Sequence, residues 1–192
     1  QPEFTQIDLE MSFAKEEDVM EIVEGMLKAI FKAAKGTDIP IPFPRMRYDE
    51  AMLRYGNDKP DIRFGLELSD ITGIFRESGF KVFSDAIKKG GIVKALNLKG
   101  KGGELSRKEI DDLVAFAQKN GASGMAWIRF GEKAESPIVK FLGDERVEKI
   151  KTAMNVEKGD IVFFIADKYS NACEILSRVR LHIGKTYGLI DE

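Results

Sequence analysis

The amino-terminal stretch carries three polar side chains that could form a small ligand site. From Gln6 to Ser12 polar and apolar residues alternate, a pattern typical of a β-strand with one wet face. On such a strand Gln6, Asp8 and Glu10 share a face, with about 6 to 7 Å between successive side chains. Two carboxylates and an amide at this spacing can hold an ammonium group or a magnesium ion. A solvated edge strand shows the same alternation, so the pattern alone leaves both interpretations open.

A second candidate site is a basic, glycine-rich segment between Lys88 and Glu109. Basic residues clearly outnumber acidic ones there, whereas the whole chain has a formal net charge of −2. Lysines on glycine loops can follow a phosphate backbone without reading bases, and a solvated hairpin is the alternative. The candidate phosphate contacts are Lys88, Lys89, Lys99, Lys101 and Lys108.

Other residues with reactive or aromatic side chains favour structural roles. Cys173 is the only cysteine and His182 the only histidine, so an internal disulfide and a site of several thiolates or histidines are excluded. We expect no metal site. The glycines at 100–103 lack the spacing of a phosphate-binding P-loop and indicate an ordinary loop. Trp127 can stack on a base, but a strand residue between apolar neighbours is more often core.

The composition is that of a globular protein of 192 residues, with 43% hydrophobic and 9% aromatic residues. Because the charges nearly balance, no field over the whole molecule would attract nucleic acid, and such binding requires a local patch. No apolar run approaches the roughly 20 residues that span a bilayer. We therefore expect a soluble, cytoplasmic protein without a membrane partner.

Hydrophobic periodicity predicts the elements of the first third of the chain. Apolar residues at helical spacing predict a helix over 15–34, ended by Gly36, and a short helix over 49–55. The prolines of 39–44 favour an extended connector between them. The turn-rich stretch 55–61 is too polar for core and indicates a boundary.

Beyond residue 64 the predicted elements follow one another more closely. A capping box formed by Ser106 and Glu109 predicts a helix that ends near Gly121, and two further helices are expected over 144–154 and 171–182. This order favours one sheet with helices packed on it. The predicted strands are 81–83, 92–98, 125–130 and 161–166.

Several separated motifs resemble those of bacterial aspartyl-tRNA synthetases, a family of class II. Residues 1–10 (QPEFTQIDLE) resemble the second strand of motif 2. Residues 64–184 resemble the GAD domain that this family carries between motifs 2 and 3. Further similar stretches follow in the family's order at 42–46, 54–63, 136–142 and 180–185.

The resemblance implies an α+β fold. The GAD domain is a DCoH-like two-layer sandwich, here with a mainly antiparallel four-stranded sheet and helices on it. Three regions are implied: a partial catalytic-core segment over 1–63, the GAD domain over 64–184, and a return segment toward the catalytic core over 185–192.

Roles for the amino-terminal residues are implied only by the resemblance. Gln1 would contact ATP, Asp8 would bind the amino group of substrate aspartate, Gln6 would line the same pocket, and Glu10 would support them. Strict alternation places Gln1 on the face opposite Asp8, so Gln1 must lie at an irregular strand end. No residue here matches a catalytic position.

The parent protein implied by the resemblance is a homodimeric ligase that uses ATP and magnesium to activate aspartate and then charges tRNA. The motif 2 arginine and motif 3 fall outside these 192 residues, so we expect this chain alone to be inactive and to hold no cofactor. It would be a monomer or pair through its opening strand. The GAD domain would stabilise or contact the acceptor side of tRNA. The alternative is an autonomous, non-catalytic module that binds tRNA or acts as a scaffold.

Overall fold

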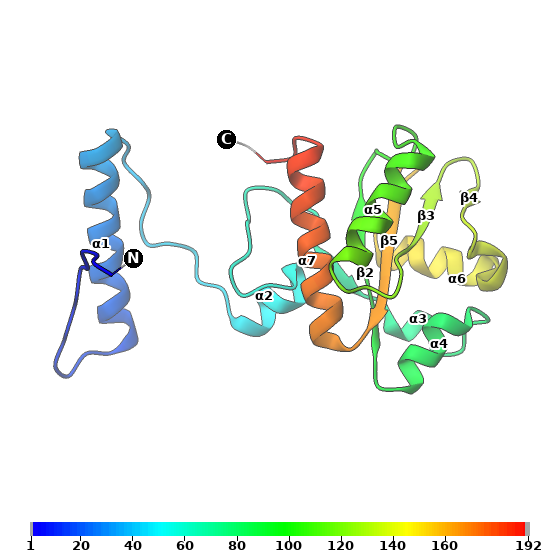
Figure 1. Cartoon of the computed structure of the whole chain (residues 1–192), viewed down its shortest axis with the longest axis horizontal. Helices are drawn as coiled ribbons and strands as arrows, with labels where there is room; N and C mark the ends of the chain where they lie inside the picture. The colour runs from blue at the N-terminus through cyan, green and yellow to red at the C-terminus, as the bar shows by residue number, and fades with distance from the viewer. Residues whose placement is uncertain (1, 191–192) are drawn as a thin grey trace. The chain divides into compact units, whose positions relative to one another are not determined.

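The computed structural model describes residues 2–190 and divides into two compact units, Gln1–Met46 and Arg47–Glu192 (Figure 1). The second unit begins earlier than the predicted GAD boundary at residue 64, because α2 (Tyr48–Tyr55) packs on β1 (Leu68–Asp70) and on α7 (Tyr169–Thr186). The three-part division by family domains stays a prediction.

The first unit is built on one amphipathic helix, α1 (Glu16–Lys35). Its first turn is acidic, which the helix dipole favours, and Gly36 ends it at a φ of 68°, as predicted. The proline-rich connector then packs back on the helix through a buried carboxylate. Glu24 accepts the backbone N–H of Phe43 at 2.9 Å and pairs with the guanidinium of Arg45.

The predicted opening strand does not form. Residues 2–12 have no strand structure, and their side chains are exposed. A strand needs a neighbour for its backbone N–H and C=O groups, and among residues 2–190 no segment pairs with this stretch. Alternation specifies which face would be wet, but it does not supply the neighbouring strand.

The second unit contains an antiparallel sheet of five strands in the order β1-β2-β5-β3-β4. The prediction of an antiparallel α+β fold is confirmed, although four strands were expected. The central pairing of β2 with β5 places Ala95 opposite Phe164 and Leu96 opposite Phe163. The remaining strands are β2 (Ile92–Leu98), β3 (Ala126–Phe130), β4 (Ala134–Glu135) and β5 (Ile161–Asp167).

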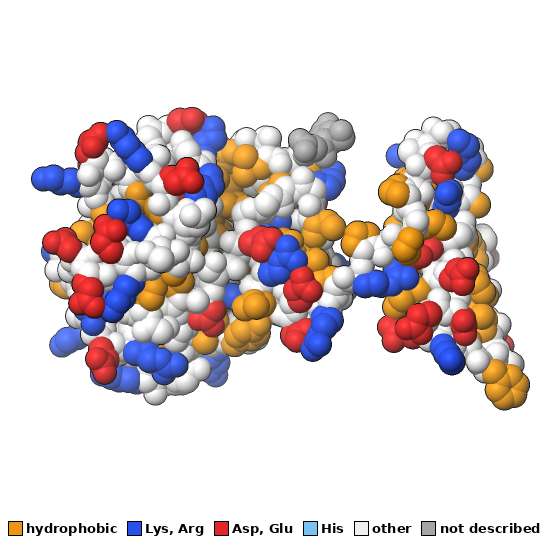
Figure 2. All heavy atoms as spheres, turned by 180° about the vertical axis from the view of Figure 1, so that it is seen from behind, with side chains coloured by type: hydrophobic (Ala, Val, Ile, Leu, Met, Phe, Trp, Pro, Cys, Tyr) orange, Lys and Arg blue, Asp and Glu red, His pale blue; other side chains and the backbone are white. Residues whose placement is uncertain are grey.

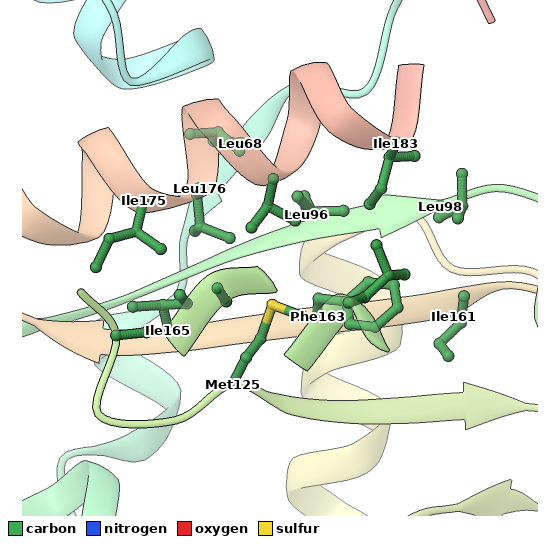
Figure 3. Close-up of a cluster of buried hydrophobic side chains, with 14 of the residues drawn as sticks. Leu68, Leu96, Leu98, Met125, Ile161, Phe163, Ile165, Ile175, Leu176 and Ile183 are labelled. Carbon is green, nitrogen blue, oxygen red and sulfur yellow. The ribbon is translucent and has the colours of Figure 1, made fainter. Parts of the chain in front are cut away.

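Helices cover both faces of this sheet, which adds one helical layer to the two layers that were expected. Phe163 of β5 lies in a core with α5 and α7, which Figure 3 shows in close-up, whereas its neighbour Phe164 lies in a second core with α3, α4 and α6. A strand with consecutive apolar residues, such as 161–166, must be covered on both sides. The helices that provide this cover are α3 (Thr72–Phe75), α4 (Lys81–Lys88), α5 (Arg107–Lys119), α6 (Val139–Ala153) and α7.

Two local predictions need correction. Residues 81–83 begin α4 instead of forming a strand, because Phe80, Phe83 and Ile87 recur at helical spacing and pack against the second core. Helix α6 begins before the predicted residue 144, but Gly143 interrupts it with a φ of 72°. The capping box of α5 is confirmed, since Ser106 accepts the N–H of Glu109.

The glycine at 184 provides a first prediction. A Cβ on Gly184 would lie 2.7 Å from the ring of Phe64, so Gly184→Ala should lower the free energy of unfolding by about 1–3 kcal/mol. The matched control is Gly73→Ala in α3, where a Cβ meets nothing within 4 Å, and which should be neutral or slightly stabilising. Urea unfolding of both variants measures the difference. Equal changes in the free energy of unfolding for the two variants would mean that the Phe64 ring moves aside without an energetic cost.

Candidate functional site

The amino-terminal candidates are not gathered into a pocket. Gln6, Asp8 and Glu10 are all exposed on an irregular segment, and none of them bonds to another residue in the described range. Gln1 lies outside the described residues. The ligand roles of these four residues stay predictions.

The basic candidates lie at opposite ends of β2. Lys88 and Lys89 precede this strand, whereas Lys99, Lys101 and Lys108 follow it. A strand of seven residues separates them by roughly 20 Å. On the face of the sheet-containing unit shown in Figure 2, blue and red side chains are interspersed. The five lysines therefore do not form the single patch that their spacing in the sequence suggests.

Lys99 is held by a buried carboxylate. Asp160, only 2% exposed, accepts the N–H groups of Gly100 and Glu157 and the side-chain amide of Asn97, each at 2.9 Å, and pairs with Lys99 at 3.1 Å. Burial alone would raise the pKa of Asp160, but these hydrogen bonds outweigh it and hold the pKa below its ordinary value. Asp160 thereby fixes the loop that follows β2.

The other lysines differ in their partners. Lys101 pairs with Glu104, and Lys88 lies 3.7 Å from Asp85. Lys89 and Lys108 have no acidic partner among the described residues. The glycine loop itself is packed against backbone, since a Cβ on Gly102 would lie 2.5 Å from the carbonyl oxygen of Asp160. The prediction of an ordinary loop at 100–103 is confirmed.

Lys94, which lies in the same basic segment, is fully buried. Its ammonium donates to the carbonyl of Met52 at 2.7 Å and to the Sγ of Cys173 at 3.2 Å, and it lies 5.4 Å from the centre of the Tyr169 ring. It therefore joins α2 to the sheet and to α7. The sequence carried one signal of this burial, because Lys94 lies on the same face of the predicted strand as the apolar Ile92, Leu96 and Leu98.

Sequence reasoning also missed the role of Arg180. This guanidinium, 2% exposed, donates to three successive carbonyls, those of Phe64 (2.9 Å), Gly65 (2.8 Å) and Leu66 (3.1 Å). It also stacks on the rings of Phe64 and Tyr55, at 4.1 and 4.8 Å from their centres. Burial lowers the pKa of Arg180 from its ordinary value. The contact joins two of the motifs noted above, 54–63 and 180–185.

The remaining singular residues are packed. His182 stacks on Phe116 with ring centroids 4.2 Å apart, Cys173 is buried in α7, and Trp127 packs partly buried against the first core. No group of three or more His, Cys, Asp or Glu residues within 2–190 has a metal-binding arrangement. Over the same range, no helix has the length and apolarity needed to cross a membrane.

The antiparallel sheet with its covering helices corresponds to a defined domain class. Residues 83–176 match the GAD domain family. The match begins within α4, includes β2, α5, β3, β4, α6 and β5, and ends within α7.

Similarity to known proteins extends over the whole chain. It is 54% identical to the aspartate–tRNA ligase of Geobacillus kaustophilus and 51% identical to the aspartate–tRNA(Asp/Asn) ligase of Aquifex aeolicus, with 100% of this chain aligned in each case. The alignments cover 33% and 32% of those relatives, so the chain spans about a third of their length. The resemblance to the bacterial aspartyl-tRNA synthetase family is thus confirmed.

The buried carboxylate provides a second prediction. Asp160→Asn should lower the free energy of unfolding near pH 7 by about 1–3 kcal/mol, because an amide cannot accept from all of these donors. Since the pKa of Asp160 is depressed in the folded state, its contribution is present above the ordinary carboxyl pKa of about 4 and is lost as pH falls through the folded value.

The difference in the free energy of unfolding between wild type and Asp160→Asn should therefore become smaller below about pH 4. Urea unfolding near pH 7 and near pH 3 measures it, with the exposed Asp112→Asn as the control. A difference that stays constant over this range would contradict the assigned role of the carboxylate.

Proposed function

We propose that this chain is part of an aspartate–tRNA ligase that activates aspartate with ATP and then transfers it to the 3′ end of tRNA. The observation that carries the proposal is about 50% identity to such ligases along the entire chain. The GAD domain match supports it independently. The ligase would be a cytoplasmic homodimer.

In this proposal the opening segment contributes to the aspartate site once a neighbouring strand orders it. Asp8 would then pair with the substrate ammonium, Gln6 would line the pocket, Glu10 would support Asp8, and Gln1 would contact ATP. A carboxylate beside an ammonium fixes the orientation of the substrate, which favours reaction. The proposed reaction needs ATP and magnesium, and no group of three or more His, Cys, Asp or Glu residues within 2–190 has a metal-binding arrangement. ATP and magnesium would be bound by other parts of the ligase.

The chain alone should therefore be inactive. Adenylate formation requires precise positioning and cationic stabilisation of the phosphates, and the family arginines that supply these lie outside these 192 residues. We expect no aspartate-dependent exchange of pyrophosphate into ATP by this chain. A full-length ligase of the same family, assayed in parallel, is the positive control. Exchange above background by the chain alone would overturn this prediction.

We further propose that the GAD domain contacts tRNA through the lysines after β2. Lys108 has no acidic partner in the described part of the chain, and Lys101 pairs only with the exposed Glu104. Because Asp160 fixes the loop, these ammonium groups are presented from a defined backbone. The alternative, an autonomous tRNA-binding or scaffolding module, differs in requiring no other part of the ligase.

A salt series tests this contact. In the full-length ligase, Lys101→Gln with Lys108→Gln should weaken tRNA binding and flatten the slope of log affinity against log salt by roughly two units or less. The matched control, Lys88→Gln with Lys89→Gln, removes two charges at the other end of β2 and should change little. Aspartate activation should be unaffected in both. Equal losses of tRNA affinity in the two double variants would argue against a contact through the lysines after β2. Full tRNA affinity of the isolated 192-residue chain would favour the autonomous module.

A further inference from the structure

The outer edge of β3 is open along part of its length. Phe130 donates its N–H to the carbonyl of Asp160 at 2.9 Å and accepts the N–H of Gly159, so its backbone groups face β5. In an antiparallel ladder, successive residues direct these groups to alternate sides. Trp127 and Arg129 therefore direct their N–H and C=O groups away from β5.

Strand β4 covers only the far end of this edge (Figure 1). It pairs with β3 at Arg129 and Phe130, and continuing that register would place Pro137 opposite Trp127. Proline has no N–H to donate, so the ladder stops there. Within residues 2–190, the outward backbone groups of Trp127 and its indole N–H find no hydrogen-bond partner.

A groove of about 300 Å³ adjoins this open edge. Its lining includes the edge itself, Met125–Trp127, and the diverging segment Ser136–Ile138. The buried Phe83 and the exposed Val82, which is 64% accessible, contribute apolar surface from α4. The groove thus combines free backbone groups with an apolar lining.

Two lysines near the groove, Lys81 and Lys140, lack an acidic partner among the described residues. Lys81 follows the groove residue Phe80, and the ammonium of Lys140 lies 5.0 Å from the centre of the Phe141 ring, which in turn lies 5.9 Å from that of Phe80. Two acidic residues, Glu135 and Asp167, are adjacent in sequence to the lining, and Asp167 already accepts the N–H of Lys168 at 2.6 Å and the side-chain amide of Asn171 at 3.4 Å.

We propose that the groove binds an extended segment of a partner protein, which adds to the edge of β3 where β4 stops. An extended segment supplies the N–H and C=O groups that match those of Trp127, as in recognition by strand addition. Its side chains would alternate between apolar residues directed into the groove and acidic residues near Lys81 and Lys140. RNA has no such backbone ladder. This binding is separate from the ligase reaction and from the lysines after β2.

Synthetic peptides can serve as probes of the intact 192-residue chain. A fluorescein-labelled peptide of alternating valine and glutamate should bind saturably, and it should shift the fluorescence of Trp127, the only tryptophan. The amide of Trp127 should exchange with solvent more slowly in the complex. The same peptide with N-methylated backbone amides should bind at least about tenfold more weakly, a loss of about 1.4 kcal/mol.

Variants assign the binding to the groove. Lys81→Glu with Lys140→Glu should weaken the valine–glutamate peptide about tenfold and strengthen a valine–lysine peptide. Val82→Asp should weaken both, and this change lies in the first turn of α4, where an acidic residue is tolerated. The matched control is Leu53→Asp in α2, also an exposed apolar residue, which should leave binding unchanged. Circular dichroism verifies that each variant is folded.

Three results would overturn the proposal. The first is no binding of the valine–glutamate peptide to the folded chain, and the second is equal binding of the N-methylated peptide. The third is evidence that something else occupies the groove. Sedimentation could show self-association that Val82→Asp abolishes, or single-stranded RNA could displace the peptide.

Discussion

The central strands β2 and β5 are buried on both faces, and this constraint determines where the other elements of the sheet-containing unit lie. Of the seven residues of β5, the first five are buried, with Phe163 and Phe164 on opposite faces. Apolar surface on both sides requires cover from both sides, at roughly 25 cal/mol for each Å² removed from water. Helices α5 and α7 supply one layer, and α3, α4 and α6 supply the other.

Three buried charged groups then hold the irregular segments on this framework. Arg180 fixes the approach to β1, Asp160 fixes the loop after β2, and Lys94 fixes α2. Each makes several hydrogen bonds, as a buried charge must if its desolvation is to be compensated. One of these structural contacts bears on function, because Asp160 fixes the loop that carries Lys101, a lysine that we propose contacts tRNA.

A single residue, Pro137, leaves part of the edge of β3 unpaired. A donor at position 137 would have extended β4 and covered the edge, but proline stops the ladder and leaves Trp127 open. Exposed edges are hazards for aggregation unless charge or a partner protects them. Lys81 and Lys140, which lack acidic partners within 2–190, would repel a basic segment and attract an acidic one. They would therefore protect the edge from unspecific pairing and favour the proposed partner.

Elements with local signals could be predicted from the amino-acid sequence alone. The capping box of α5, the apolar runs of 92–98 and 161–166, and the helical spacing of α1 each predicted their structure, because propensity and periodicity act within a few residues. The resemblance of the motifs to bacterial aspartyl-tRNA synthetases is confirmed by about 50% identity to such ligases along the chain. The burial of Lys94 and the lack of strand structure in the opening stretch were established by the tertiary structure. These outcomes depend on partners far away in the sequence, such as Met52 and Cys173 for Lys94, and periodicity carries no information about them.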